Sequence, residues 1–403
     1  MRGSFQIFQS TSIFGSLFFF GILVDSSFGQ NHSSLGRLDP PPYLSLRNHY
    51  YQGLHMKVDP GYLPFNRLQT YEPLQKCLSQ SVLKIYQEKP GNDLGLALVD
   101  LSGEKIKSPQ FAHYQSSIMM YGASQSKVGV LIAAHQLRYD IKRLGQTVGN
   151  HLGRMKRKAA IFFAPELSQY TLDDKLSFSL AKGDGLTVDF TDEFRDELVQ
   201  MVRFSNNKIA AKVIQKLGFN YINSTLWQLG AYDPEYDGGL WVGKAYGGGE
   251  HWHRDPLSHQ SHGISAFSLA RIFTLLAQKR LINQQASESM LAMLSDTKFR
   301  IKFVRGLMRI GLKINGENSI GSPHGAIVYR KSGTYRSTPS YHHDAILVQR
   351  SVCEEKKCTE TKDIQYVATG ALRGKNYLSP LIQEMDRCIV MNNQGKAEEP
   401  IAR

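Results

Sequence analysis

Residues 123–134 read ASQSKVGVLIAA. The stretch begins with small and polar residues and continues as a run of apolar residues and glycine from Val128 to Ala134. This pattern predicts a helix that opens at Ser124 and is apolar on nearly every side. Helices of that kind lie buried at the centre of a fold. We therefore expect the rest of the chain to be arranged around this helix.

The start of the same stretch has the pattern S-x-x-K, formed by Ser124 and Lys127. A serine hydroxyl is a poor nucleophile until a base removes its proton. Residues three apart on a helix share a face, so Lys127 should lie beside Ser124. A lysine that is buried near other cations favours its neutral form and can act as that base. The backbone N–H of Ser124, at a helix N-terminus, is a candidate oxyanion donor.

Two further short motifs follow in order. Residues 205–207 (Ser-Asn-Asn) form S-x-N and precede a helical pattern, and residues 331–333 (Lys-Ser-Gly) form K-[ST]-G at the end of a strand pattern. Each motif alone is weak, but their order and settings together favour one site. The N–H of Thr334, next on that strand, is the second candidate oxyanion donor.

The distribution of strand and helix patterns predicts the domain organisation. Strand patterns gather in residues 73–123 and 320–392, whereas residues 124–319 are mostly helical. We predict the α/β fold class: an α+β sandwich made of both termini, with an antiparallel sheet flanked by helices, plus an inserted all-α domain over 124–319. Residues 30–72 are predicted to be an N-terminal arm, and 393–403 a C-terminal tail.

The first 29 residues are typical of a secretory signal. Arg2 is followed by the apolar run Ile13–Val24, which at 12 residues is shorter than the roughly 20 needed to span a bilayer. Small residues at Ser27 and Gly29 predict cleavage after Gly29. The alternative is a retained membrane anchor. We expect a periplasmic or secreted protein with no stable membrane span after cleavage.

Export makes disulfides chemically possible, and the chain has four cysteines. Four cysteines allow three pairings. Cys353 and Cys358 bracket a polar turn between two strand patterns, so they are placed to clip a hairpin. Cys77 and Cys388 would then join the first helix to the last. The alternative is four free thiols.

The net charge of +13 bears on the partners of the protein. A basic exported protein is attracted to anionic envelope polymers and lipid headgroups. No nucleic-acid-binding motif appears, so we expect no nucleic-acid partner. The basic run at residues 154–158 is interpreted as a solvated face. We expect a monomer.

Four histidines, at positions 251, 253, 259 and 262, raise the possibility of a zinc site. Their spacing is permissive, and no H-E-x-x-H helix accompanies it. We interpret this stretch as a polar loop and expect no bound metal.

The three motifs resemble those of the penicillin-recognising serine enzymes, and class A β-lactamases in particular. Residues 123–134 resemble the nucleophile helix of that family, 204–218 its Ser-Asp-Asn loop and following helix, and 264–294 a late helical segment. The likeness runs from about residue 72 to 390. It implies a β-lactamase/transpeptidase-like fold and acyl transfer without a cofactor.

The resemblance also implies roles for individual residues. Ser124 would be the nucleophile, Lys127 its proton partner, and Ser205 a relay of the proton to the leaving nitrogen. Substrate would be bound by Asn207, Lys331, Ser332, Gly333 and Thr334.

The sequence departs from the family pattern at several points. Asn206 replaces the usual aspartate, and the long gaps between the motifs predict insertions near 145–175 and 230–260. The E-x-x-L-N motif that carries the deacylation glutamate of class A enzymes is absent from the sequence. Glu235 and Glu250 are the candidate replacements. Without an effective base the acyl-enzyme should persist.

We therefore predict an exported serine hydrolase that forms an acyl-enzyme on Ser124 with a β-lactam or a D-alanyl cell-wall peptide, with slow deacylation. Three alternatives remain open at this stage: a D-alanyl-D-alanine carboxypeptidase or transpeptidase, a hydrolase of another small amide or ester, and a non-catalytic envelope-binding pseudo-hydrolase.

Overall fold

The structure is a computed structural model, and it describes residues 70–87, 91–149, 151–167, 172–181, 185–233, 238–246, 254–295, 302–315, 322, 324–353 and 361–395. The described α-helices are α2 (Glu72–Tyr86), α3 (Lys127–Thr147), α4 (Leu152–Leu167), α5 (Asp192–Arg203), α6 (Asn207–Leu217), α7 (Phe219–Gln228), α8 (Ala266–Ala277), α9 (Gln284–Leu294), α10 (Phe303–Arg309) and α11 (Leu378–Gln394). The described strands are β1 (Leu94–Asp100), β2 (Gln110–Tyr114), β3 (Met120–Tyr121), β4 (Leu176–Ala181), β5 (Gly185–Phe190), β6 (Tyr232–Asp233), β7 (Gly238–Gly239), β8 (Trp241–Val242), β9 (His262–Ile264), β10 (Lys313–Ile314), β11 (Gly325–Tyr335), β12 (Tyr341–Cys353) and β13 (Thr361–Arg373).

The largest sheet joins strands from both ends of the chain. Its six strands have the order β10-β11-β12-β13-β1-β2, and every pair is antiparallel except β10 with β11. The N-terminal strand β1 lies in the interior, where Leu98 pairs with Ala368 of β13. The sheet therefore cannot form until the two ends of the chain meet.

Alternate side chains of β1 enter two different apolar cores. Leu96 and Leu98 belong to the core that includes residues of α2, α10 and α11, whereas Ala97 and Val99 belong to the core that includes residues of α3 and α8. Successive strand residues point to opposite faces of a sheet, so both faces of β1 are covered. The whole strand is buried for this reason.

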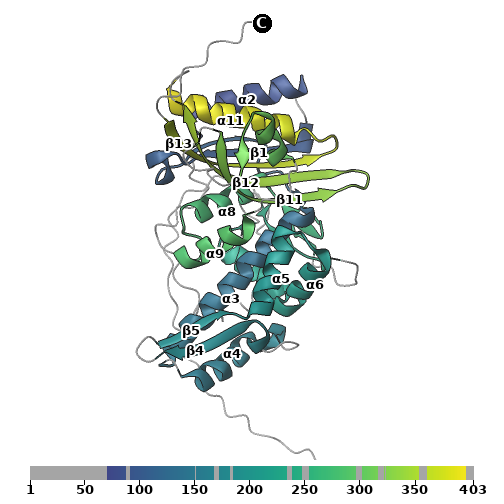
Figure 1. The fold of residues 1–403 in the computed structure, drawn as a ribbon. Coiled ribbons are helices and arrows are strands. Elements are labelled where there is room, and N and C mark those ends of the chain that lie inside the picture. Colours follow the sequence, from purple (N-terminus) through teal and green to yellow (C-terminus); the bar gives the residue numbers. More distant parts are fainter. Residues whose placement is uncertain are drawn as a thin grey trace, which may run out of the picture. The chain divides into compact units, whose positions relative to one another are not determined.

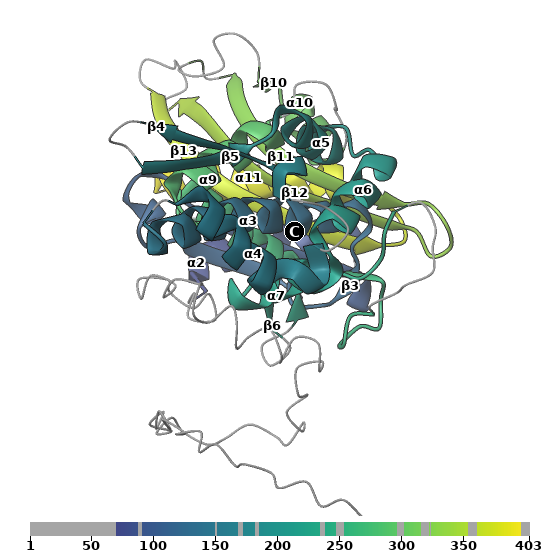
Figure 2. The ribbon, with the colours of Figure 1, turned by 90° about the horizontal axis from the view of Figure 1, so that it is seen from below.

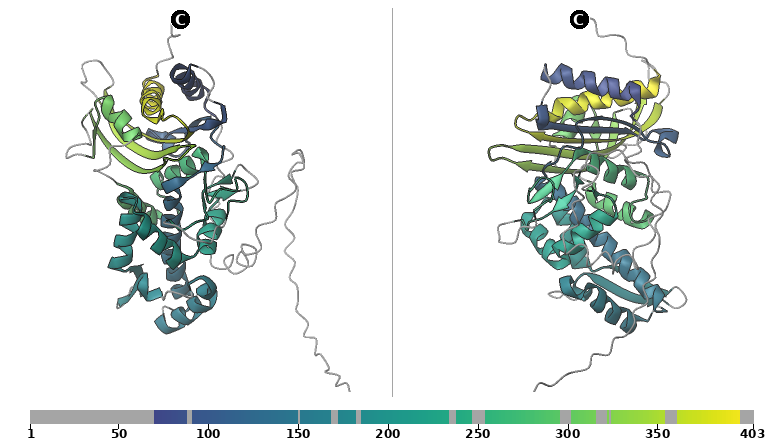
Figure 3. Two further views of the ribbon diagram at one scale, coloured as in Figure 1. Left: turned by 90° about the vertical axis from the view of Figure 1, so that its right-hand side faces the viewer. Right: turned by 180° about the vertical axis from the view of Figure 1, so that it is seen from behind.

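Helices cover both faces of the sheet, as Figure 1 shows. Helices α2 and α11 lie side by side on one face in both views of Figure 3, and α8 packs on the other face against β1, β12 and β13. This arrangement confirms the predicted fold class, an antiparallel-rich sheet made from both termini and flanked by helices. The domain boundaries proposed above remain predictions.

The central helix begins slightly later than the sequence predicts. Residues Ala123–Ser126 form a 3-10 turn, η4, and the α-helix α3 starts at Lys127. Ser124 thus lies on a tight turn at the end of the helix. Along its 21 residues, α3 is buried over most of its surface, as expected for a central helix. Ser265 is the N-cap of α8, because its hydroxyl accepts the N–H of Ser268 (3.1 Å).

A hairpin interrupts the region that the sequence analysis describes as mostly helical. Strands β4 and β5 pair antiparallel with Phe178 opposite Val188, and Figure 2 shows them side by side. The alternating apolar pattern of both strands and the intervening Lys-Gly-Asp are signals of a hairpin that the helical interpretation overlooks. The hairpin packs against α3.

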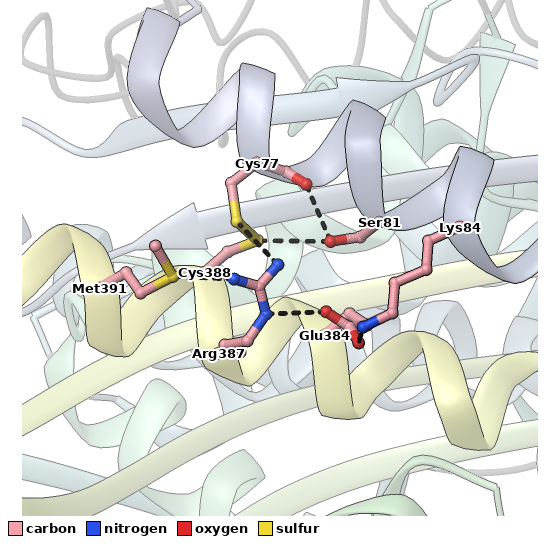
Figure 4. Close-up of a disulfide and its surroundings, with 7 residues drawn as sticks. All are labelled: Cys77, Ser81, Lys84, Glu384, Arg387, Cys388 and Met391. Carbon is pink, nitrogen blue, oxygen red and sulfur yellow. Dashed lines mark hydrogen bonds and ion pairs between the residues drawn. A yellow bond between two sulfur atoms is a disulfide. The ribbon is translucent and has the colours of Figure 1, made fainter. Parts of the chain in front are cut away.

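A disulfide joins Cys77 of α2 to Cys388 of α11. In Figure 4 the bond lies between the two helices, next to the hydroxyl of Ser81, which donates to the carbonyl of Cys77 (2.8 Å). An ion pair between Lys84 and Glu384 (2.6 Å) crosses the same pair of helices. Cys353 ends β12, and Cys358 lies outside the described residues, as does the predicted signal segment.

We expect the double variant Cys77→Ala/Cys388→Ala to lose about 2–4 kcal/mol of unfolding free energy, because the disulfide closes a very long loop in the unfolded chain. Urea unfolding of both proteins under non-reducing conditions measures this difference. An unchanged midpoint and slope would show that the helix packing alone holds the termini together.

No helix among the described segments combines the length and the apolar character needed to cross a membrane.

Candidate active site

The side chain of Lys127 connects two of the three sequence motifs directly. Its Nζ donates to the hydroxyl of Ser124 (3.1 Å) and also to oxygens from the S-x-N motif. These are the carbonyl of Ser205 (2.8 Å) and Oδ1 of Asn207 (2.6 Å), with Ser205 Oγ at 3.3 Å. Lys127 is fully buried, whereas Ser124 is partly exposed. The geometry thus presents a hydroxyl at the surface with an amine directly behind it.

Burial lowers the pKa of Lys127 to about 7. Removing an ammonium from water disfavours its charged form, and within the described part of the chain no carboxylate contacts this amine to offset that cost. The ring of Tyr246, with its centroid 4.2 Å from Nζ, offers only a weaker cation–π attraction. A substantial fraction of Lys127 is therefore neutral near pH 7 and can accept a proton.

Ser205 brings the third motif into the same site. Its hydroxyl accepts a hydrogen bond from Lys331 Nζ (3.0 Å) while lying 3.3 Å from Lys127 Nζ. Its backbone has a φ of 56°, a left-handed conformation that is uncommon for a residue with a side chain. In this conformation both the carbonyl and the hydroxyl of Ser205 face Lys127. The three motifs therefore meet around one serine hydroxyl.

Lys331 lies in an unusually cationic setting. It is nearly fully buried, and burial together with the charges of Lys127, Arg330 and Lys302 holds its pKa well below the usual value. Its Nζ also donates to the carbonyl of Ser332 (2.9 Å). A negatively charged group placed here would restore the charge of Lys331.

The replacement of aspartate by Asn206 has a clear structural role. Its Oδ1 accepts the backbone N–H groups of Lys208 (3.0 Å) and Ile209 (3.3 Å), so Asn206 is the N-cap of α6. Asparagine and aspartate are comparably good N-caps. The outer residues of the motif, Ser205 and Asn207, remain the ones that contact Lys127.

The end of β11 runs past η4, the turn that carries Ser124, at very close range. A Cβ on Gly333 would lie 2.9 Å from the carbonyl oxygen of Gly122 and 3.1 Å from the backbone nitrogen of Gln125. The side chain of Gln125 also donates to the carbonyl of Lys331 (2.5 Å), which ties the turn to the strand. Thr334, the next residue, is exposed. Glycine at 333 is what allows the strand to approach the turn this closely.

Tyr246, which lies outside the three motifs, supports the turn η4. Its hydroxyl donates to the carbonyl of Ala123 (2.6 Å) and lies 2.6 Å from the hydroxyl of Ser126. His262 stacks on the Tyr246 ring at 4.7 Å, and burial and the nearby Lys127 lower the pKa of His262 to about 3. No local pattern marks either residue, because each reaches the site from a distant segment.

A lysine outside the three motifs supports the end of β11. Lys302 is buried, and its Nζ donates to the carbonyls of Gly333 and His343, the latter at 2.7 Å. His343 in turn contacts the carbonyl of Tyr121 through Nε2 (2.7 Å). Lys302 therefore links β11 and β12 directly beneath the predicted substrate-binding residues.

Several predicted residues fall outside the described part of the chain. These are both candidate deacylation bases, Glu235 and Glu250, and the histidines at 251 and 253. Of the other two histidines, His262 lies in the site described here. Among the residues that the structure describes, no group of three or more His, Cys, Asp or Glu side chains is arranged to hold a metal ion.

Residues 159–354 match the model of the β-lactamase enzyme family. Over this range the chain resembles the serine β-lactamase-like family. The resemblance predicted from the sequence is thereby confirmed. The matched range, just under half of the chain, includes S-x-N and K-[ST]-G but begins after Ser124 and Lys127. These two residues are tied to the matched region by the hydrogen bonds of Lys127.

Solved structures similar to this β-lactamase-like protein include a β-lactamase from Sphaerobacter thermophilus, with 13% identity over 79% of this chain and 97% of that one, at a TM-score of 0.45. A class A β-lactamase from Bacteroides cellulosilyticus has 13% sequence identity over 81% of this chain and 99% of that one, at a TM-score of 0.45. PBP-A has 14% sequence identity over 81% of this chain and 99% of that one, at a TM-score of 0.46. At such identities and scores these likenesses carry no activity over to this chain. A search of the curated proteins finds no match.

For the β-lactamase-like protein we expect Gly333→Ala to lower the unfolding free energy by about 1–3 kcal/mol. Backbone atoms at the turn η4 must move to admit a methyl group. The matched control is Gly153→Ala, where the nearest atom is 3.8 Å away. Thermal or urea unfolding measures both. Equal stability of the two variants would contradict the close approach of β11 to η4.

Proposed function

We propose that this β-lactamase-like serine hydrolase forms an acyl-enzyme on Ser124 by attack on an amide carbonyl. The contact of a buried Lys127 amine with the Ser124 hydroxyl (3.1 Å) is the observation that carries this proposal. The nucleophile, its base and two further motif residues lie in one hydrogen-bonded network. A group of this kind has no evident structural purpose, since burying a lysine without a carboxylate partner costs stability.

The first chemical step is assigned to Ser124 and Lys127. Neutral Lys127 takes the hydroxyl proton, and the Ser124 oxygen forms a bond to the carbonyl carbon, giving a tetrahedral oxyanion. The backbone N–H groups of Ser124 and Thr334 are the proposed donors to that oxyanion. Donors of this type contribute about 3 kcal/mol each to transition-state stabilisation.

The second step releases the leaving nitrogen. The carbon–nitrogen bond breaks, and the nitrogen receives a proton through the hydroxyl of Ser205. That hydroxyl lies between the amines of Lys127 and Lys331, so either amine can replace the proton it gives up. The product of these two steps is an ester between the acyl group and Ser124.

Substrate recognition is assigned to the rest of the network. Lys331 and Ser332 would bind a substrate carboxylate, which restores the positive charge that burial and neighbouring cations disfavour in the empty site. Asn207 would bind the substrate amide, and Gly333 and Thr334 would pair with it along the strand. We propose β-lactams or D-alanyl cell-wall peptides as substrates because both join an amide to a nearby carboxylate.

Deacylation is proposed to be slow, because the sequence lacks the E-x-x-L-N motif. No carboxylate of a described residue contacts Ser124 or Lys127. A lasting acyl-enzyme suits a D-alanyl-D-alanine carboxypeptidase or transpeptidase as well as a slow β-lactamase. We propose a periplasmic or secreted location from the signal-like first 29 residues, and the disulfide between Cys77 and Cys388 supports an oxidising compartment.

Incubation with a fluorescent penicillin should label the mature protein at Ser124, and Ser124→Ala should abolish the label. Intact mass and peptide mapping measure the adduct. Ser108→Ala, a substitution of an exposed serine, is the matched control and should label normally. A folded protein that gives no adduct would sink the acyl-transfer proposal and favour a binding protein.

The lifetime of the same adduct distinguishes the two kinds of enzyme. Persistence well beyond the labelling time agrees with slow deacylation, whereas rapid loss with release of hydrolysed penicillin indicates β-lactamase turnover. Glu235→Gln and Glu250→Gln then test the two candidate bases, since loss of the true base lengthens the lifetime.

The acylation rate at saturating probe should rise with pH and pass its half-maximal value near pH 7. The sign follows from the pKa of Lys127, which burial lowers to about 7, because only the neutral amine can accept the Ser124 proton. Stopped-flow fluorescence between pH 5.5 and 8.5, roughly the span over which such a group titrates, measures the profile. A rate that falls with pH over this range would rule out Lys127 as the base.

A further inference from the structure

A cavity lined largely by polar residues lies along the later turns of α3. Its volume is about 360 Å³. It is bounded by α3, β5 and the start of α9, three elements that Figure 1 labels. Its lining includes His135, Arg138, Lys142 and Arg143 of α3 and Asn283 at the start of α9. At 1.5 Å per helical residue, the centre of this stretch is about 20 Å from Lys127. The cavity is therefore separate from the network around Ser124.

The cavity has a strong positive bias. Arg138, Lys142 and Arg143 line it, and none of its described lining residues is acidic. The nearest carboxylate partner of Arg138 is Asp189, whose oxygens are shared between Arg138 and Arg195 at 3.0 Å each. Asp140 attracts Arg143 electrostatically but is buried, and burial raises its pKa to about 7. Among the described residues, these two carboxylates offset only part of the positive charge.

His135 supplies an observation independent of charge. It is fully buried and lines the cavity, yet neither of its ring nitrogens has a hydrogen-bond partner among the residues that the structure describes. The His135 ring packs against the Phe190 ring in a T-shaped arrangement, with the ring centroids 4.9 Å apart. This contact holds the imidazole in place without a hydrogen bond to either nitrogen. Buried polar atoms are nearly always paired, so an unpaired imidazole at a cavity wall indicates a missing partner.

The beginning of α9 adds a further source of positive potential. Asn283 is the N-cap of this 11-residue helix and accepts the N–H of Ala286 (2.8 Å). Asn283, Gln285 and Ala286 all line the cavity. The first turn of a helix carries a partial positive charge and N–H groups without helical acceptors, and it favours anions.

We propose that this cavity binds a phosphate group, either free or as part of a phosphate ester. Guanidinium groups match phosphate oxygens with paired donors, and the ammonium of Lys142 adds a point charge. A dianion compensates the excess positive charge better than a single carboxylate does. A metal cation is excluded as the occupant by the same positive field. The phosphate can belong to a soluble molecule or to a lipid headgroup.

The test measures binding of inorganic phosphate to the full mature protein by isothermal titration calorimetry. We expect saturable binding that weakens by about tenfold or more in Lys142→Glu, which turns an attractive contact into a repulsive one. Lys142 is exposed, so the variant should fold, and its melting temperature without phosphate checks this. Lys158→Glu is the matched control: it makes the same charge change on an exposed residue of α4 and should bind phosphate normally.

Two further ligands identify the source of the phosphate. Glycerol phosphate represents a soluble ester, and phosphatidylglycerol vesicles, compared with phosphatidylcholine vesicles, represent a lipid headgroup. Binding of either one that is lost in Lys142→Glu but kept in Lys158→Glu supports the site. Absence of saturable phosphate binding, or an equal loss in both variants, would overturn it. Both variants should keep the acylation rate of Ser124, so this result is independent of the proposed function.

Discussion

The burial of the Lys127 amine is the constraint on which the proposed site depends. Burial lowers the pKa of Lys127 from 10.5 to about 7. At neutral pH this reduces the free energy of unfolding by about 5 kcal/mol relative to a protein with a solvated lysine. The folded protein binds fewer protons than the unfolded chain between these two pH values, so its stability rises across that interval. The two apolar cores around the large sheet must offset this cost at pH 7.

Several side chains hold the segments around that amine in place. Asn206 caps α6, so that Ser205 and Asn207 meet Lys127 at the helix start. Tyr246 fixes the carbonyl that precedes Ser124, and Gln125 ties the same turn to β11. None of these contacts takes part in a proposed bond-making or proton-transfer step. Each narrows the positions available to a reacting group, and such positioning contributes a large part of enzymatic rate acceleration.

The sequence is informative where one residue's neighbour lies a few positions away. Ser124 and Lys127 share a helical face by their spacing alone, and the short apolar runs in β1 and β13 mark strands. Tyr246, His262 and Lys302 could not be identified in this way, because their roles arise from contacts with residues 16 or more positions away in the chain. The β4–β5 hairpin does have a local signal, the alternation of apolar residues on both sides of a short polar turn. The predicted helices on either side of it favour a helical interpretation of the whole region.

The disulfide between Cys77 and Cys388 makes nearly the whole described chain a covalent ring. Ser124, Ser205 and Lys331 all lie within that ring. A protease that cut any single connecting loop between the two cysteines would linearise the ring without releasing a fragment. Such nicked molecules would keep the three motif segments at a high effective concentration, and they would separate into two pieces on a gel only after reduction.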